Sequence, residues 1–157
     1  MLPSFARRYV QHGLSATPVV LEALLGRLSP DDPIWDARPD ADRFTLREMT
    51  AHLADWEPIW LERITRTLQE EEPTLPGIDE GRLAIDHDYA HSNPIESLTR
   101  FRDGRARLTA VVAQIEEADW GRAAQREGLG RATIDAQVVL IVGHDAYHLR
   151  EAAERLP

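Results

Sequence analysis

Two histidines, His144 and His148, stand four residues apart in the stretch GHDAYHLREAAERL near the C-terminus. In an α-helix, side chains at this spacing project from one face, so two imidazoles can bind the same metal ion. A site with two ligands is weak, and a third protein ligand has to come from another part of the chain. The pair alone leaves two interpretations open, metal ligands or core histidines held by hydrogen bonds.

A third histidine, His52, lies in TLREMTAHLADWEPIW, where Met49, Leu53 and Trp56 place it close to the apolar side of a predicted helix. If that helix packs against the one with the histidine pair, three imidazoles meet in an apolar interior, where charging any of them is costly. A divalent cation removes this difficulty by binding their lone pairs. Because only unprotonated imidazole binds a metal, we expect metal affinity to fall below about pH 6.

A second pair with the same spacing, His87 and His91, occurs in DHDYAHSNP. It precedes the helix-start signal Ser92-Asn93-Pro94, in a stretch rich in loop-forming residues. An irregular backbone does not hold two rings in register, so we expect solvated loop histidines here rather than metal ligands.

The segments that carry the metal-ligand candidates are predicted to be helices. Thr45 and Glu48 form a capping box at the start of the helix with His52, which runs to about Gln69 with Pro58 as a candidate kink. Thr133 is expected to cap the last helix.

The remaining pattern predicts two more long helices and one short one. Residues 4–12 predict a short N-terminal helix that ends near Gly13, and Thr17-Pro18 opens the next helix, which stops at residues 29–33. A further long helix runs from Ser92-Asn93-Pro94 to about Asp119. Loops are expected at 34–44 and over most of 73–91, and a loop or hairpin at 120–131. We therefore predict one all-α domain over residues 1–157, a four-helix bundle with a short extra N-terminal helix.

Composition excludes several classes of chemistry. The 157 residues contain no cysteine and no lysine, so thiolate nucleophiles, cysteine metal sites and Schiff bases are excluded. A formal net charge of −9 argues against nucleic acid as a partner. No apolar run is long enough for a membrane span and the N-terminus lacks a signal-peptide pattern, so we expect a cytoplasmic protein without a membrane partner. The use of arginine in place of lysine, with abundant alanine, is typical of a GC-rich bacterial genome.

At His52, His144 and His148 the sequence resembles the DinB-like superfamily of metalloenzymes, also called DinB/YfiT-like. The resemblance rests on FTLREMTAHLADWE, on GHDAYHLREA and on the long helix between them. It implies an up-down-down-up four-helix bundle, often a homodimer, in which these three histidines bind a divalent zinc, nickel, iron or manganese ion. It also implies a metal-dependent transferase or isomerase that uses a low-molecular-weight thiol such as bacillithiol, mycothiol or glutathione.

Two residues of the helix with His52 are further site candidates. Glu48 lies one turn before His52 and can orient that ring or act as a base, although its capping role already accounts for it. Trp56 can line a substrate pocket, with core packing as the alternative.

The last helix offers three more residues to consider. Tyr147 can line the pocket or lie at a subunit interface. Arg150 stands where many relatives have glycine, and it can bind an anionic substrate group or pair with Glu154 on the same helix face. Asp145 points about 100° away from His144, so we expect it to contact another helix or solvent.

These features predict a metal-dependent enzyme that acts on a small electrophilic molecule, as a thiol-dependent S-transferase, isomerase or hydrolase. Because the chain has no cysteine, a sulfur nucleophile has to come from a cosubstrate. The alternative is a non-catalytic dimeric stress-response or binding module whose metal site is structural, adventitious or empty. No fourth protein ligand is evident, which favours the open form of site that catalysis needs.

Overall fold

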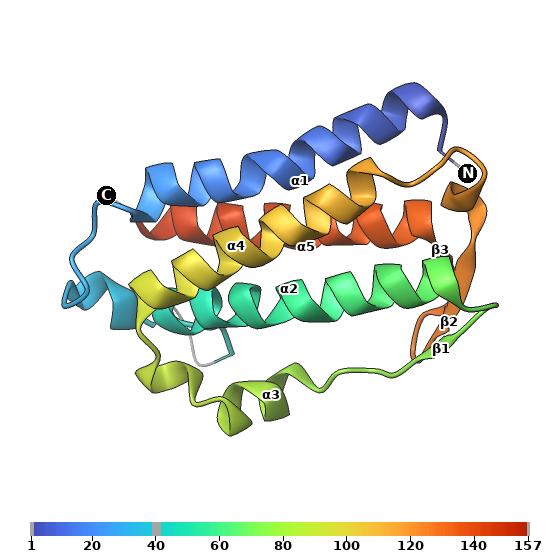
Figure 1. The fold of residues 1–157 in the computed structure, drawn as a ribbon. Coiled ribbons are helices and arrows are strands. Elements are labelled where there is room, and N and C mark those ends of the chain that lie inside the picture. Colours follow the sequence, from blue (N-terminus) through green and yellow to red (C-terminus); the bar gives the residue numbers. More distant parts are fainter. Residues whose placement is uncertain (1, 39–41, 157) are drawn as a thin grey trace.

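The computed structural model describes residues 2–38 and 42–156 of the chain. Four long helices form the bundle and a three-stranded sheet closes one end of it (Figure 1). The helices and strands are α1 (Ser4–Leu25), α2 (Leu46–Gln69), β1 (Thr74–Leu75), α3 (Glu80–Asp86), α4 (Pro94–Ala113), β2 (Ala123–Arg126), β3 (Gly130–Thr133) and α5 (Ile134–Arg155). Short 3-10 turns occupy Pro33–Asp36, Tyr89–His91 and Asp119–Gly121.

The direction of the four long helices confirms the expected connectivity. α1 and α5 run one way and α2 and α4 the other, an up-down-down-up arrangement (Figure 1). Such a bundle needs long connections, and the segment from β1 to α4, which includes α3, crosses outside it. None of the described helices is apolar over enough of its length to cross a lipid bilayer.

The two helices that carry the histidines begin where their capping residues predict. Thr45 accepts a hydrogen bond from the Glu48 amide and the Glu48 carboxylate accepts one from the Thr45 amide, so the predicted capping box is present. The Thr133 hydroxyl oxygen accepts a bond from the Ala136 amide at the start of α5. α2 runs through Pro58 as one helix.

The predicted break in the N-terminal region is wrong, because α1 is continuous through Gly13 and Pro18. Pro18 has no amide hydrogen for the Leu14 carbonyl. That carbonyl instead accepts a bond from Nη1 of Arg105 on α4, at 3.1 Å. A Cβ on Gly13 would lie 3.3 Å from Val142 Cγ1, so this glycine allows close packing of α1 on α5 and does not end the helix.

The structure contains short helices and strands in segments that were predicted to be mostly loop. Residues 73–91, expected to be mostly loop, contain β1, α3 and a 3-10 turn. The predicted hairpin is β2 and β3, which pair antiparallel, while β1 adds to β2 in parallel. The third long helix, α4, ends at Ala113 and not near Asp119.

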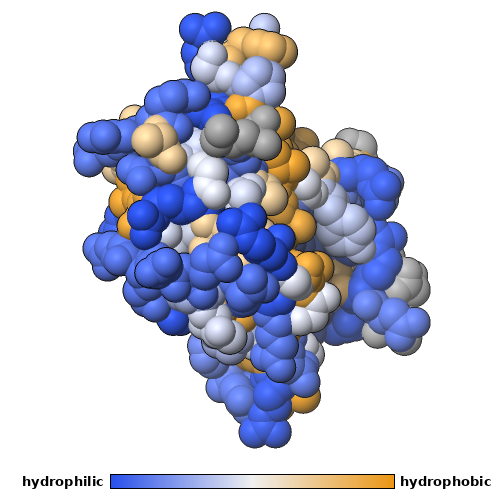
Figure 2. Space-filling view, turned by 90° about the vertical axis from the view of Figure 1, so that its right-hand side faces the viewer, coloured by the Kyte–Doolittle hydropathy of each residue, from blue (hydrophilic) through white to orange (hydrophobic). Residues whose placement is uncertain are grey.

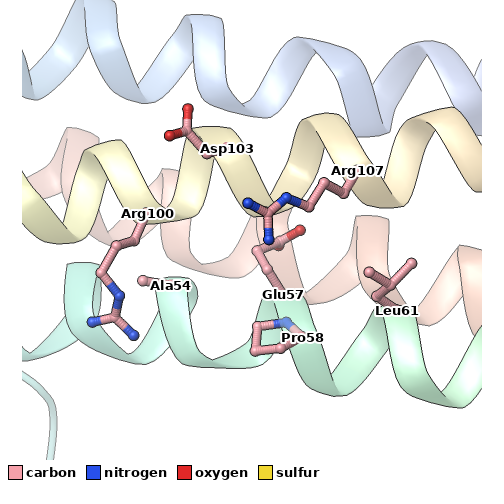
Figure 3. Close-up of a pocket in the computed structure, with 8 residues that line it drawn as sticks. Ala54, Glu57, Pro58, Leu61, Arg100, Asp103 and Arg107 are labelled. Carbon is pink, nitrogen blue, oxygen red and sulfur yellow. The ribbon is translucent and has the colours of Figure 1, made fainter.

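Packing between α2 and α4 is unusually close at Gly104. A Cβ at this position would lie 2.6 Å from Glu57 Cβ, so a side chain there would push the helices apart. A groove of about 280 Å³ follows this contact, with Arg100, Asp103 and Arg107 on the α4 side (Figure 3). None of the metal-ligand candidates lines this groove.

Candidate metal centre

His52 from α2 and His144 and His148 from α5 converge inside the bundle. One ligand atom of each histidine lies within 4.8 Å of the other two. The closest approach is 2.9 Å, between the Nε2 atoms of His52 and His144. His52 and His148 are buried, at 1% and 5% exposure. The expected convergence of two helices on one point is therefore present.

The hydrogen bonds of the histidine ring nitrogens indicate whether these residues suit a metal ion. Nδ1 of His148 lies 3.0 Å from Oε2 of Glu151, so Nδ1 can carry the proton and Nε2 the lone pair. Within the described chain, the Nδ1 atoms of His52 and His144 are buried and have no hydrogen-bond partner. The Nε2 atoms of His52 and His144 lie 2.9 Å apart, so they can share one hydrogen bond or, when both are unprotonated, bind the same cation. The donor set fits a divalent ion.

All three imidazoles are held in the neutral form that binds metals. Burial, and then the neighbouring imidazoles, lower the pKa of His52 to about 2 and, with Arg105 also contributing, that of His144 to about 3. Burial also lowers the pKa of His148, although Glu151 opposes that shift. Two aromatic rings flank His52: the half-buried Phe44 at 5.2 Å and the buried Trp56 at 6.0 Å, centroid to centroid.

A cavity of about 480 Å³ opens onto the cluster. It is lined by Asp42, Arg43, Phe44, Glu80, Gly81, His144, Tyr147, His148 and Glu151. The cluster therefore joins a buried aromatic wall to a space large enough for a small molecule.

These shifts predict how the metal-free protein responds to acid. The folded-state pKa values lie below the ordinary histidine value near 6.5, so the unfolded chain binds more protons between that pH and the folded values. The stabilisation is present above about pH 6.5 and is lost as the pH falls, by at most about 1.4 kcal/mol per pH unit for each histidine.

Urea unfolding of chelator-treated protein at pH 5.5, 6.5 and 7.5 measures this effect. We expect the free energy of unfolding to fall from pH 6.5 to 5.5, and His52→Gln to reduce the fall. Equal values at pH 5.5 and 7.5 would contradict the buried, neutral cluster.

Glu48 and Trp56 lie on α2 beside the cluster but not in the cavity. The Glu48 carboxylate accepts bonds from Arg38 at 2.8 and 2.9 Å, and no hydrogen bond or ion pair joins it to the three histidines in the described structure. Its orienting role stays a prediction. Trp56 is 5% exposed and packs in the core, with its ring 5.7 Å from that of His144.

Tyr147 lines the cavity and Arg150 does not. The Tyr147 ring lies 5.0 Å from the His148 ring, centroid to centroid, and the residue is 47% exposed. Arg150 pairs with Glu154 at 3.4 Å, as their spacing predicts. The proposed substrate contact of Arg150 stays a prediction.

The second histidine pair points to two different carboxylates. Nδ1 of His87 lies 2.6 Å from Asp55 on α2, and Nδ1 of His91 lies 2.7 Å from Asp88. Neither ring joins the three-histidine cluster. This agrees with the interpretation of His87 and His91 as loop histidines.

Two features of the site are not predicted from the sequence: the contact of Glu151 with His148 and the ion-pair partner of Asp145. Glu151 stands three residues after His148, on the same helix face, and that spacing could have found it. Asp145 contacts another helix, as expected, but the partner is the fully buried Arg105 of α4, which also binds Glu57 of α2. No local pattern links these three residues, because only the fold brings them together.

The fold and the site define a four-helix bundle with a three-histidine cluster. Residues 14–152 match the DinB superfamily, and the chain belongs to this family. A curated protein of Oceanobacillus iheyensis, named "Putative metal-dependent hydrolase OB0413", is 23% identical over 105 residues, which span 66% of this chain and 60% of that protein.

A solved structure has the same fold. YfiT from Bacillus subtilis, described as "a probable metal-dependent hydrolase with an unusual four-helix bundle topology", superposes with a TM-score of 0.90 over 99% of this chain and 88% of that one. The sequence identity is 20%, so this likeness shows the fold alone.

Proposed function

We propose that this chain is a metal-dependent enzyme in which His52, His144 and His148 bind a divalent ion at the inner end of the cavity. The observation that carries the proposal is the convergence of three neutral imidazoles, with two Nε2 atoms 2.9 Å apart, at the wall of an accessible space. Zinc, nickel, iron and manganese are the candidate ions. When bound by three neutral ligands with positions left open, such an ion lowers the pKa of water or of a thiol and polarises an electrophile.

The other residues of the site have separate roles in this proposal. The Glu151 carboxylate accepts a hydrogen bond from Nδ1–H of His148 and so leaves the lone pair on Nε2, which faces the cluster. Trp56 excludes water from the inner side of His52, and Phe44 lines the cavity beside the His52 ring. Tyr147 and Glu80 line the cavity. Partial desolvation raises the pKa of the Glu80 carboxyl, which makes it a stronger base than an ordinary glutamate.

Two reactions are compatible with this site. Hydrolysis is supported by the names of the Oceanobacillus and Bacillus relatives. Transfer or isomerisation with a low-molecular-weight thiol is supported by the DinB-like motifs, and the sulfur would come from a cosubstrate because the chain has no cysteine. Membership in a homodimer, a small-molecule substrate and a cytoplasmic location belong to the same proposal.

The test is the metal content of untagged protein, followed by activity. Mass spectrometry after dialysis against trace-metal buffer is expected to find close to stoichiometric divalent metal, which chelation removes. The loaded protein is then assayed for ester and amide hydrolysis, and for coupling of glutathione, bacillithiol or mycothiol to small electrophiles. Absence of metal as purified, with no uptake of zinc, nickel, iron or manganese, would leave only the non-catalytic binding module.

A further inference from the structure

Two arginines, Arg63 and Arg126, pack against the tryptophans of α2, and neither forms an ion pair with a carboxylate in the described part of the chain. The Arg63 guanidinium carbon lies 5.2 Å from the centre of the Trp56 ring and 5.4 Å from that of Trp60. The Arg126 guanidinium carbon, at the end of β2, lies 5.5 Å from the same Trp60 ring. Both arginines are more than nine-tenths buried, at 4% and 8% exposure.

Their hydrogen bonds leave buried donors unused. Nη2 of Arg63 donates to the Pro76 carbonyl at 2.9 Å. Nη1 of Arg63 and Nη1 of Arg126 are both buried and have no hydrogen-bond partner among the residues that the structure describes. Among residues 2–38 and 42–156, no carboxylate forms an ion pair with either side chain. A buried guanidinium with unsatisfied donors is costly, so this arrangement calls for an acceptor.

Arg105 shows how this protein usually treats a buried cation. It is 1% exposed, and it has two carboxylate partners, Glu57 and Asp145. Arg63 and Arg126 have no carboxylate partner among the described residues, and they repel each other. Burial and the charge of Arg126 lower the pKa of Arg63 to about 10, although the Glu62 carboxylate opposes that shift. Burial lowers the pKa of Arg126 as well. Two positive charges over one indole ring, with no ion-pair partner among the described residues, favour an incoming anion.

We propose that Arg63 and Arg126 form an oxyanion-binding site, which takes a carboxylate or phosphate group of a ligand. Planar guanidinium groups with free Nη donors suit the oxygens of such a group. Arg63 lies on α2 and Arg126 ends β2, so the site lies between α2 and the hairpin. Figure 2 shows the end of the molecule that carries the sheet, where hydrophilic side chains predominate. It uses none of the three histidines and does not rest on the proposed metal-dependent activity.

The position of the site also suggests how it relates to the histidine cluster. Trp60 contacts both arginines and its ring lies 6.0 Å from that of His144, centroid to centroid. One aromatic layer therefore separates the anion site from the cluster. The charged group of a ligand bound by the arginines would lie near Trp60, whose ring also borders the candidate metal centre.

The test is the melting temperature of the full-length chain against rising sodium phosphate, sodium acetate or sodium chloride at equal ionic strength. It is run on protein as purified and after chelation, so that anions bound by a metal are recognised. We expect a saturating rise with phosphate or acetate beyond that with chloride, and the salt that gives it identifies the class of oxyanion. Arg126→Gln is expected to weaken this binding at least about tenfold, the loss of one charge-assisted contact.

Two further variants make the result specific. Arg107→Gln removes an exposed arginine of α4 and is expected to keep the wild-type response, which separates site binding from general salt effects. Arg126→Lys keeps the charge but lacks the planar fork, so it is also expected to bind at least about tenfold more weakly, and it replaces the glutamine variant if that one does not fold. A wild-type response equal to that with chloride would overturn the proposal, as would a full response in either Arg126 variant.

Discussion

Replacing His148 with alanine is expected to lower the affinity for a divalent ion by at least about a hundredfold, because a direct ligand should matter more than an outer partner, whose loss costs about 10- to 100-fold. His148 supplies one of the three converging nitrogens and is buried, at 5% exposure, so the alanine variant keeps two of the three ligands. Glu151→Gln is expected to give an intermediate loss of about 10- to 100-fold, since Nδ1 of His148 loses its carboxylate acceptor at 3.0 Å. Zinc titration against a chromophoric chelator at pH 7.5 measures both affinities.

His91→Ala is the matched control for this series. His91 shares the HxxxH spacing, but Nδ1 of its ring lies 2.7 Å from Asp88 and its side chain is 80% exposed. Its removal should leave zinc affinity unchanged. Equal affinity in the wild type and the His148 variant would show that the cluster is not the metal site, whereas a loss in the His91 variant would reopen the case for the second pair.

The sequence predicts well those features that depend on near neighbours. Thr45 and Glu48 mark the start of α2 because both halves of a capping box lie within four residues. His144 and His148 share a face because a helix fixes that relation locally. His52 was expected at the core because its neighbours at helical spacing are apolar. Each of these arguments needs only one helix at a time.

Features that depend on a distant residue could not be predicted. Gly13 and Pro18 read as helix-breaking signals, yet α1 continues, because Arg105 of α4 bonds the Leu14 carbonyl that Pro18 leaves free. The same limit applies to Arg63 and Arg126, which are separated in sequence and brought to one indole ring by the pairing of β1 with β2 and the packing of α2. Whether a polar group can be buried depends on hydrogen-bond and ion-pair partners that only the tertiary structure supplies.

Replacing Arg105 with methionine is expected to destabilise the protein by about 3–5 kcal/mol at pH 7, the usual cost of leaving a buried charge without its partner. Arg105 is 1% exposed and bonds Glu57 through Nε and Nη2 at 3.0 and 2.7 Å. It also binds both carboxylate oxygens of Asp145, whose Oδ2 accepts the Thr17 hydroxyl hydrogen at 2.7 Å. The network therefore joins all four long helices, and its loss leaves two buried carboxylates side by side.

The pH dependence of this loss separates charge from packing. Burial already raises the pKa of Glu57, with Arg105 opposing that shift, so removing Arg105 should raise the pKa further. The Glu57 carboxyl then takes up a proton as the pH falls, and the deficit relative to wild type should shrink between pH 7 and pH 5. A deficit that stays constant with pH would point to a packing defect. Urea unfolding of chelator-treated protein at both pH values gives the measurement.

Two comparisons complete the experiment. Arg102→Met alters an exposed arginine of the same helix, which pairs with its exposed neighbour Asp103, and should change stability by less than about 0.5 kcal/mol. Adding Glu57→Leu and Asp145→Leu to the Arg105 variant removes the uncompensated carboxylates and should recover most of the lost stability, because apolar groups can replace a buried ionic cluster.

Asp145 directly follows His144, so zinc affinity measured on that triple variant tells whether the network also holds α5 in the orientation that brings its histidines to His52. Recovered stability with weakened zinc binding would assign the network to positioning the site, and recovery of both would limit it to the fold.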